Sequence, residues 1–275
     1  MGTEVRPVRF QSGLLEALET RLAREGGELS DFVNMAVDRA LHGDAGERRL
    51  RAVPEPIAQE ELHGACVAYR RALLDRDPVR ARAVVDDLVA RGVRMIDLYE
   101  SVLAPAMGEI GELWALEQVT VADEHYATEE TAQILNTLAP ERRVAPTRGR
   151  LAVVGGSPDE LHSIGPRMVA DLLERAGWEV IALGAGAPAG DLARLVSAEC
   201  PDVVALSTAT VGRLPGAEEA IGLLRQVRPR PLLAVGGGLY RGPAVDLARA
   251  WGADVVTSDL KDFLAQLHER FPPVG

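Results

Sequence analysis

The stretch "LAVVGGSPDELHSIG", residues 151–165, decides the fold of the C-terminal half of the chain. It joins a six-residue apolar run to a polar loop, which is the order typical of a buried strand that ends at a ligand-binding face. A strand, a glycine pair and such a loop usually indicate a nucleotide site. This loop differs because it carries His162, two residues after Glu160 and three before Gly165.

Apolar runs of strand length alternate with helical patterns from residue 150 onward. The runs read "LAVVGG", "EVIALG", "DVVALS", "PLLAVGG" and "DVVTS". Five buried-type strands with short helical crossovers predict an α/β fold, a doubly wound parallel five-stranded sheet. In such a sheet the loops at the carboxyl ends of the strands form the binding face, and His162 lies on it.

A helical period dominates residues 57–140, where four helical segments predict a four-helix bundle. Pro78 suits the first turn of the second helix, Gly92 suits its end, and Pro105 is expected to kink or interrupt the third. Polar, proline-containing linkers flank the bundle. The predicted domains are residues 1–50, a ribbon-helix-helix-like or dimerisation segment; 55–140, the bundle; and 149–275, the sheet domain.

Composition restricts the classes of protein to consider. The chain has 275 residues, a net charge of −11 and 47% hydrophobic residues, enough to bury a sizeable core. Neither a membrane span nor an export signal is indicated, and the two cysteines form no disulfide framework, so we expect a cytoplasmic protein. The acidic charge gives no general reason to bind nucleic acid or an anionic membrane.

Two common occupants of such a sheet are poorly supported. The loop after the first strand lacks the G-x-G-x-x-G pattern, and the second strand ends without the acid that would hold a ribose, which argues against a dinucleotide. A zinc site needs three or four ligands, and His63 with Cys66 supplies only two. A single imidazole can still ligate a metal that arrives with its other ligands supplied, as cobalt does in a corrin.

Three motifs at successive strand ends resemble the signature of cobalamin-binding domains. They are Glu160-x-His162-x-x-Gly165, then Ser207 with Thr208 and Ala209, then Gly236-Gly237. The resemblance implies that His162 replaces the dimethylbenzimidazole base below the cobalt and that Glu160 holds its other ring nitrogen. Gly165 would let the loop approach the corrin, Ser207 and the glycine pair would line the slot for the displaced tail, and Ser163 and Ile164 belong to the same loop. Many family members have Asp where this chain has Glu160.

A second motif lies in the bundle. Trp114, nine residues and then Glu124-His125 resemble the Trp-x9-Glu-His motif of CarH-type cobalamin-dependent photoreceptors. The resemblance implies that the indole covers the adenosyl group of adenosylcobalamin and that Glu124 and His125 contact it. An upper alkyl ligand needs such an apolar cover together with polar groups that recognise a ribose.

Ala115 departs from the DNA-binding members of that family. In them a histidine directly after the tryptophan captures the cobalt once light has cleaved the carbon–cobalt bond. A methyl group cannot ligate cobalt, so either water or another donor such as His125 takes the position, or a second chromophore occupies the space. The second option resembles photocobilins, which also bind a bilin such as biliverdin.

The N-terminal residues 1–45 resemble a ribbon-helix-helix module with "VRPVRF" as its ribbon. That resemblance implies an obligate dimer that contacts DNA through side chains such as Arg9. Pro7 would remove a ladder donor from the ribbon, and five arginines against eight acids leave a charge of about −3, a poor surface for phosphate. DNA binding and dimerisation alone therefore both stay open.

Three classes of function fit these patterns. The leading one is a sensor and not an enzyme: a homo-oligomer in which loss of the adenosyl group in light changes the packing of the bundle. The second is a corrinoid carrier that shuttles methyl groups between methyltransferases, whose modules lack the Trp-x9-Glu-His motif. The third is a subunit of an adenosylcobalamin mutase, which would need a substrate barrel from a separate chain.

Overall fold

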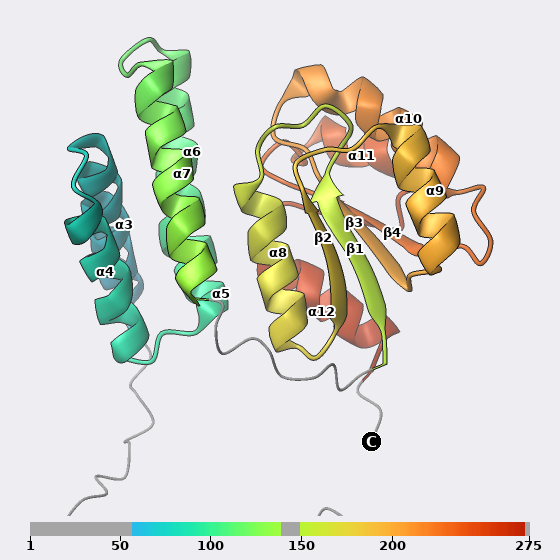
Figure 1. Cartoon of the computed structure of the whole chain (residues 1–275), viewed down its shortest axis with the longest axis horizontal. Coiled ribbons are helices and arrows are strands. Elements are labelled where there is room, and N and C mark those ends of the chain that lie inside the picture. The colour runs from blue at the N-terminus through green and yellow to red at the C-terminus, as the bar shows by residue number, and fades with distance from the viewer. Residues whose placement is uncertain (1–56, 139–148, 273–275) are drawn as a thin grey trace, which may run out of the picture. The chain divides into compact units, whose positions relative to one another are not determined.

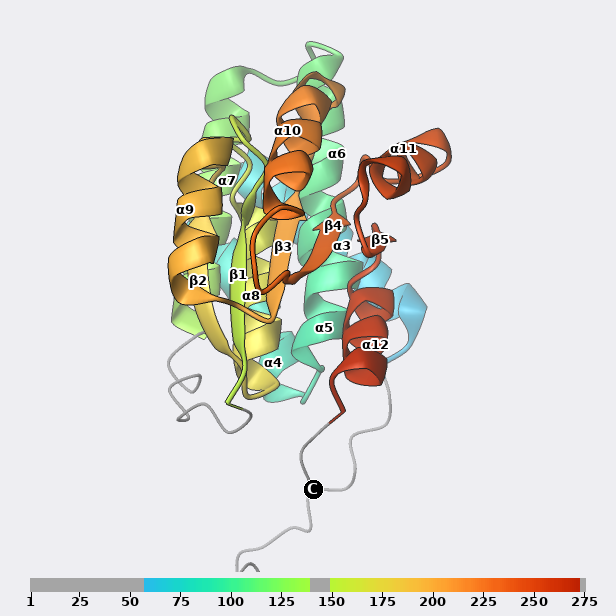
Figure 2. The same cartoon turned by 90° about the vertical axis from the view of Figure 1, so that its right-hand side faces the viewer.

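The computed structural model describes residues 57–138 and 149–272, and these residues belong to one compact unit. The segment over residues 1–50, with its expected ribbon, helices and DNA contacts, lies outside the described residues. Figures 1 and 2 show two views of the described elements. A helical bundle comes first in the chain, and a sheet domain follows it.

Four helical segments form the bundle, as the sequence predicts. They comprise α3 (Gln59–Leu74), α4 (Pro78–Ala90), the composite of α5 (Met95–Leu98), a π-helical stretch (Tyr99–Leu103) and α6 (Ala104–Ala115), and α7 (Val121–Leu138). Asp77 caps α4 by accepting a hydrogen bond from the backbone amide of Arg80 at 2.9 Å. Gly92, just beyond α4, has a φ of 82°, which only glycine adopts without strain.

Pro105 marks the place where the third helix changes its winding. Proline has no backbone N–H, and its ring clashes with the carbonyl group one turn earlier. The π-helical stretch Tyr99–Leu103 ends just before this proline, which lies in the first turn of α6. The predicted interruption is therefore a local change from α- to π-helical winding, and the helical path continues through it.

The five predicted strands form one parallel sheet, so the doubly wound α/β fold is confirmed. They are β1 (Leu151–Gly156), β2 (Glu179–Gly184), β3 (Val203–Ser207), β4 (Leu232–Gly236) and β5 (Val255–Thr257). Their spatial order is β2-β1-β3-β4-β5, and every neighbouring pair is parallel. The expectation of five buried strands is wrong for β2. It lies at the edge of the sheet, where its side chains stay exposed or half-buried.

Helices cover both faces of the sheet. They are α8 (Ile164–Arg175), α9 (Ala189–Glu199), α10 (Leu214–Leu224), α11 (Pro243–Trp251) and α12 (Leu260–Arg270). One apolar cluster joins the strands to α8 and α12, and another joins them to α9, α10 and α11. A third cluster packs Ile164, Met168 and Leu172 of α8 against the bundle. Helix α8 is therefore shared by the sheet and the bundle.

The strand order places a topological switch point between β1 and β3. β1 has β2 on one side and β3 on the other, so the chain reverses its direction of winding between β1 and β3. At such a switch point the following loops diverge and leave room for a ligand beyond the carboxyl ends of the strands. The predicted site residues of the sheet domain follow β1, β3 and β4, at this edge.

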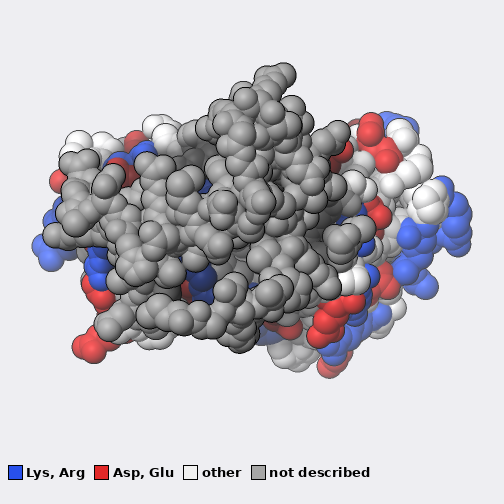
Figure 3. Space-filling model, turned by 90° about the horizontal axis from the view of Figure 1, so that it is seen from below, with Lys and Arg blue, Asp and Glu red and all other residues white. Residues whose placement is uncertain are grey.

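Charged side chains of both signs share the surface. In Figure 3, Lys and Arg lie beside Asp and Glu at both ends of the face shown. Arg230, for example, pairs with Asp254 at 2.9 Å. Within residues 57–138 and 149–272, no helix is long and apolar enough to cross a membrane.

Candidate functional site

Glu160 anchors the loop that follows β1. Its side chain is 1% exposed. One carboxylate oxygen accepts a hydrogen bond from the backbone amide of Ala209, after β3, at 2.8 Å, and the other accepts from the ring and the backbone amide of His162. The backbone carbonyl of Glu160 accepts from the amide of Gly186, after β2, at 2.7 Å. One residue thus joins the loops after three strands.

The two ionisable groups of this pair favour their charged forms. Burial raises the pKa of the Glu160 carboxyl, but hydrogen bonds from the His162 ring and from the backbone amides of Ala209 and His162 outweigh it and lower that pKa to about 2. The hydrogen bond to Glu160 raises the pKa of His162 against the opposing effect of burial. The carboxylate of Glu124, in α7, adds to this rise, and Arg213 opposes it.

The His162 ring has one nitrogen held and one free to act as a ligand. Glu160 binds Nδ1, which in the neutral ring leaves the lone pair on Nε2, and the side chain is 51% exposed. A carboxylate behind a histidine is the arrangement that orients a metal ligand. Among the described side chains, no group of three His, Cys, Asp or Glu could hold a metal ion. A metal at His162 would have to bring most of its other ligands with it.

The residues predicted to line the tail slot lie close together at the ends of β3 and β4. Ser207 ends β3 and pairs with Gly236, which ends β4. Gly237 has a φ of 116°, and a Cβ there would stand 2.5 Å from the carbonyl oxygen of Thr208. A Cβ at Gly165 would lie 3.2 Å from Ser207 Oγ. Glycine at positions 165 and 237 therefore permits close approaches to Ser207 and Thr208.

Three residues of the predicted set lie differently from the sequence-based picture. Gly165 is in the first turn of α8, not in the loop before it. Ile164 is buried in the cluster shared by α8 and the bundle, because an apolar side chain at the start of that helix faces the bundle core. Thr208 is fully buried. Ser163, half-buried, is the residue before α8.

A chain of hydroxyl groups, which the sequence analysis did not find, lies at the same edge. Ser157 Oγ is 2.6 Å from Thr208 Oγ1, which is 3.0 Å from the hydroxyl of Tyr240. Burial raises the pKa of Tyr240, although the hydrogen bond to Thr208 opposes it. These residues stand 51 and 32 positions apart, so no local pattern connects them. Ser157 lies in the stretch that follows the first strand and Thr208 in the second motif, but Tyr240 belongs to no motif.

The predicted motif of the bundle lies at the α6–α7 turn. Trp114 is in the last turn of α6 and is 46% exposed. His125 Nδ1 lies 2.7 Å from a carboxylate oxygen of Glu124. The other oxygen of Glu124 accepts from the Thr128 hydroxyl at 2.9 Å. Ala115 ends α6 and is exposed. The influence of Glu124 on the pKa of His162 links this turn to the loop after β1.

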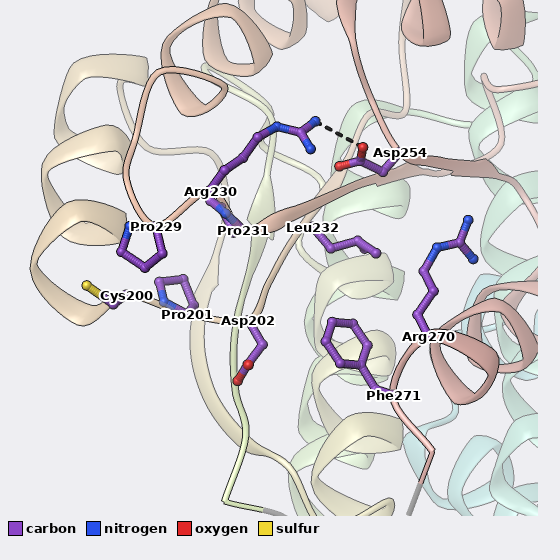
Figure 4. Close-up of a pocket in the computed structure, with 10 residues that line it drawn as sticks. All are labelled: Cys200, Pro201, Asp202, Pro229, Arg230, Pro231, Leu232, Asp254, Arg270 and Phe271. Atoms are coloured by element: carbon purple, nitrogen blue, oxygen red, sulfur yellow. Dashed lines mark hydrogen bonds and ion pairs between the residues drawn. The ribbon is translucent and has the colours of Figure 1, made fainter.

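A cavity of about 530 Å³ lies at the opposite edge of the sheet, by the amino ends of β3 and β4 (Figure 4). Three prolines, Leu232 and Phe271 form much of its wall, and Arg230 and Asp254 pair across part of it. None of the predicted site residues lines it. The convergent polar groups, the tight glycines and the shifted pKa values of Glu160 and His162 lie instead at the carboxyl edge.

Comparison with known proteins identifies the two described regions. A family described as "B12 binding domain" matches residues 150–267, and a second B12 binding domain family matches residues 67–139. The HTH-type transcriptional repressor CarH of Myxococcus xanthus is 35% identical over 228 residues, which cover 80% of this chain and 73% of the repressor. This chain belongs to the CarH-type family of cobalamin-binding proteins. Cobalamin is therefore its cofactor.

Corrinoid proteins are also similar to this CarH-type chain. The trimethylamine corrinoid protein of Methanosarcina barkeri is 26% identical over 203 residues, covering 72% of this chain and 92% of that protein. The structure of the monomethylamine corrinoid protein of the same organism has a TM-score of 0.65 and 16% identity, covering 78% of this chain and all of that one. The second likeness shows a common fold.

The residues at the carboxyl edge fit a cobalamin. Corrin nitrogens supply four cobalt ligands, and the half-exposed His162, held from behind by a buried carboxylate, can supply one more from Nε2. The backbone is closely packed at Gly237, where a side chain would collide with Thr208. The CarH-type assignment and the chemistry of this edge therefore agree.

Proposed function

We propose that this protein is a light sensor and not an enzyme: it holds adenosylcobalamin in darkness and changes conformation when light removes the adenosyl group. Bound adenosylcobalamin supplies a cobalt–carbon bond that green or near-ultraviolet light breaks. The protein would supply the lower ligand, the cover above the corrin and the conformational response. Similarity to CarH, a transcriptional repressor, supports a regulatory role.

On the lower side, His162 would ligate cobalt in place of the dimethylbenzimidazole base. Glu160 would fix the tautomer of the ring through its hydrogen bond to Nδ1. Because Glu160 also holds Ala209 and Gly186, the position of His162 depends on the loops after β2 and β3. The slot beside Ser207, Gly236 and Gly237 would take the displaced tail.

On the upper side, Trp114, Glu124 and His125 would meet the adenosyl group. One observation carries this part of the proposal: the indole of Trp114 is 46% exposed at the end of α6, on the α6–α7 turn that also bears the Glu124–His125 pair. The exposed indole of Trp114 offers an apolar cover, and the Glu124–His125 pair offers polar groups to a ribose. Without an adenosyl group, the indole and the α6–α7 turn would lose this contact surface, and the bundle could repack.

Two finer features also belong to the proposal. Ala115 leaves no imidazole beside Trp114, so water, another donor such as His125, or a bilin such as biliverdin would occupy the position above the corrin in the light. The output would be a change of homo-oligomeric state, with or without DNA binding through residues 1–45. A far-red absorption band on addition of biliverdin, and a salt-dependent shift of a promoter fragment that is lost on deleting residues 1–50, test these features separately.

A methyl-carrying corrinoid protein is the second candidate function. It is favoured by the fold shared with the monomethylamine corrinoid protein and by 26% identity to the trimethylamine corrinoid protein. A carrier must expose the upper face of its corrin to partner enzymes. Trp114 and the Glu124–His125 pair would then have no adenosyl group to recognise, and adenosylcobalamin would bind no better than methylcobalamin.

The decisive experiment is an absorption spectrum of the full chain loaded with adenosylcobalamin in darkness, recorded before and after green light. The sensor predicts a base-off, His-on spectrum that light converts irreversibly. The carrier predicts binding of methyl- or hydroxocobalamin without preferential binding of adenosylcobalamin. His162→Ala should abolish the His-on spectrum, whereas His268→Ala, which removes an exposed histidine of α12, should leave it intact. An unchanged spectrum in His162→Ala removes His162 from the axial role.

A further inference from the structure

The hydroxyl chain connects three loops that carry the site. Ser157 directly follows β1, Thr208 directly follows β3, and Tyr240 lies in the loop after β4. All three side chains are buried, and each neighbouring pair is within hydrogen-bond distance. Buried hydroxyl groups are normally hydrogen-bonded, because burying one without a partner lowers the stability of the folded protein. The chain thus joins the carboxyl edge of the sheet from β1 to β4.

The backbone next to this chain forms the predicted slot. The amide of Ser157 donates to the carbonyl of Ser207 at 2.8 Å, and the amide of Thr208 donates to the carbonyl of Gly236 at 2.9 Å. Gly237 lies so close to Thr208 that a Cβ would overlap its carbonyl group. The strand ends are thus held by backbone bonds, and a shift of Tyr240 relative to Thr208 would change the separation between the loops that follow β3 and β4.

The hydrogen bonds of Glu160 at the same edge connect a different set of loops. Glu160 joins the loops after β1, β2 and β3 and holds His162. Among the described residues, none of its hydrogen bonds reaches the loop after β4. Thr208 and Tyr240 supply the side-chain bond between the loops after β3 and β4. The hydrogen bonds of Glu160 therefore position the proposed cobalt ligand, His162. The hydrogen bonds of the hydroxyl chain instead position the loops after β3 and β4.

We infer that Tyr240, acting through Thr208 and Ser157, is a positioning residue that sets the width of the crevice for the displaced base of cobalamin, so that the site prefers complete cobalamin to corrinoids that lack the base. The inference rests on the proposed function, in which His162 displaces that base from cobalt. A displaced dimethylbenzimidazole is a flat aromatic group, and burying it between two loops requires a fixed separation between them. The hydrogen bond between Tyr240 and Thr208 supplies this constraint.

Tyr240→Phe in the full chain tests the inference, because it keeps the buried ring and removes only the hydroxyl. Dissociation constants are measured for hydroxocobalamin and for cobinamide, which lacks the nucleotide and its base. We expect about five- to tenfold weaker binding of hydroxocobalamin, the usual effect of one hydrogen bond, and unchanged binding of cobinamide. Ser157→Ala shortens the chain from its other end and is expected to reduce the same preference.

Tyr69→Phe is the matched control. Tyr69 is also a fully buried tyrosine, and its hydroxyl lies 2.9 Å from Thr131 Oγ1 inside the bundle. Tyr69→Phe removes a comparable buried hydrogen bond away from the crevice. The ratio of the dissociation constants for hydroxocobalamin and cobinamide should therefore stay as in the unmodified chain. A general loss of stability would act alike on both variants.

Two results overturn the inference: equal weakening for both ligands in Tyr240→Phe and Ser157→Ala, or no weakening in either variant. Failure of the proposed function is recognised separately. If adenosylcobalamin does not respond to light in the unmodified chain, the sensor is wrong, yet the preference for hydroxocobalamin over cobinamide can still be measured. If that preference is absent from the unmodified chain, or if His162→Ala retains the His-on spectrum, the base is not displaced into the crevice and the inference fails.

Discussion

The two ends of the bundle are held against the sheet domain in different ways. At one end, here called the base, the Tyr99 hydroxyl donates to Asp171 of α8 at 2.7 Å, and both groups are buried. Glu100 accepts from the backbone amide of Leu260 at 2.9 Å, and Lys261 lies 3.1 Å from carboxylates of the bundle. The base includes the π-helical stretch that precedes Pro105.

The other end, here called the tip, comprises residues 114–125. Trp114, Leu116 and Val121 are exposed there. Among the described residues, no hydrogen bond or ion pair joins the tip to the sheet domain, although the charge of Glu124 contributes to the raised pKa of His162. The difference shows that the described contacts attach the bundle to the sheet domain through its base, whereas the tip, which would face the adenosyl group in the proposed function, forms no such bonds. The π-helical stretch Tyr99–Leu103 lies at the base, and π-helical stretches often occur at functional positions.

The largest expected effect is at the base. Asp171→Ala removes the acceptor of Tyr99 and the partner of Arg175, whose Nε lies 2.6 Å from the carboxylate. Breaking a buried ionic hydrogen-bonded group typically costs about 3 kcal/mol, so the free energy of unfolding should fall by about that amount in urea. Asp191→Ala, which removes an exposed ion pair of α9, should change it by less than about 0.5 kcal/mol. Equal changes in the free energy of unfolding would mean that the buried contacts of the base stabilise the protein no more than an exposed ion pair does.

The next effect concerns the support of His162. Glu160→Gln removes the charge behind the imidazole, and loss of such a supporting group usually weakens metal binding about 10- to 100-fold. Titration of the protein with hydroxocobalamin measures this change. Glu179→Gln, at the exposed start of β2, serves as the control and should bind as the unmodified chain does. Unaltered affinity in Glu160→Gln would show that the lower ligand does not depend on this carboxylate.

A smaller effect on stability is expected at the tip. Trp114→Ala should change the free energy of unfolding by less than about 1 kcal/mol, because the side chain is half exposed and contributes little to the core. It should nevertheless weaken binding of adenosylcobalamin more than binding of hydroxocobalamin, since only the former has an upper group to cover. Val79→Ala, at an exposed position of α4, controls for loss of surface area. Equal losses for both cobalamins would argue against a cover.

The smallest effect is on the titration of His162 in the cobalamin-free protein. Its pKa is raised, first by the hydrogen bond to Glu160 and then by the charges of Glu160 and Glu124, against burial. Protonation of His162 therefore stabilises the fold below its ordinary pKa of about 6.5, and this contribution is lost as the pH rises through the higher folded-state pKa. Glu124→Gln should lower that pKa in an NMR titration.

Glu129→Gln is the matched control, because Glu129 is an exposed residue of the same helix that does not contribute to the shift. The same titration in both variants would mean that the tip does not act on His162. A decrease in Glu124→Gln alone would sharpen the contrast between the base, which is joined by bonds, and the tip, which acts at a distance.

Much of the architecture could be predicted because its signals are local. The bounds of β1 and β2 coincide with the runs "LAVVGG" and "EVIALG", since a short apolar run that contains β-branched valine or isoleucine favours a strand. The exposure of β2 could not be predicted, because the sequence of an edge strand in a parallel sheet resembles that of its neighbours. Pro105 predicted an interruption, but its π-helical form depends on how the following turn packs.

The candidate site divides in the same way. The spacing of Glu160 and His162 predicts a pair, and the structure brings their side chains together because they are two residues apart in one loop. The hydrogen bond between Thr208 and Tyr240 joins residues 32 positions apart, in the loops after two different strands. The sequence of neither loop shows which other loop it will contact, so this bond could not be predicted.

The sequence by itself determined the parallel sheet, the helical bundle and the loop with its histidine, because strand and helix patterns and short spacings act within a few residues. The tertiary structure alone decided that Glu160 joins three loops, that Ser157, Thr208 and Tyr240 form one chain, and that the bundle is bonded at its base and open at its tip. These features depend on which strands become neighbours, and the free energy of burial across the whole domain selects that order.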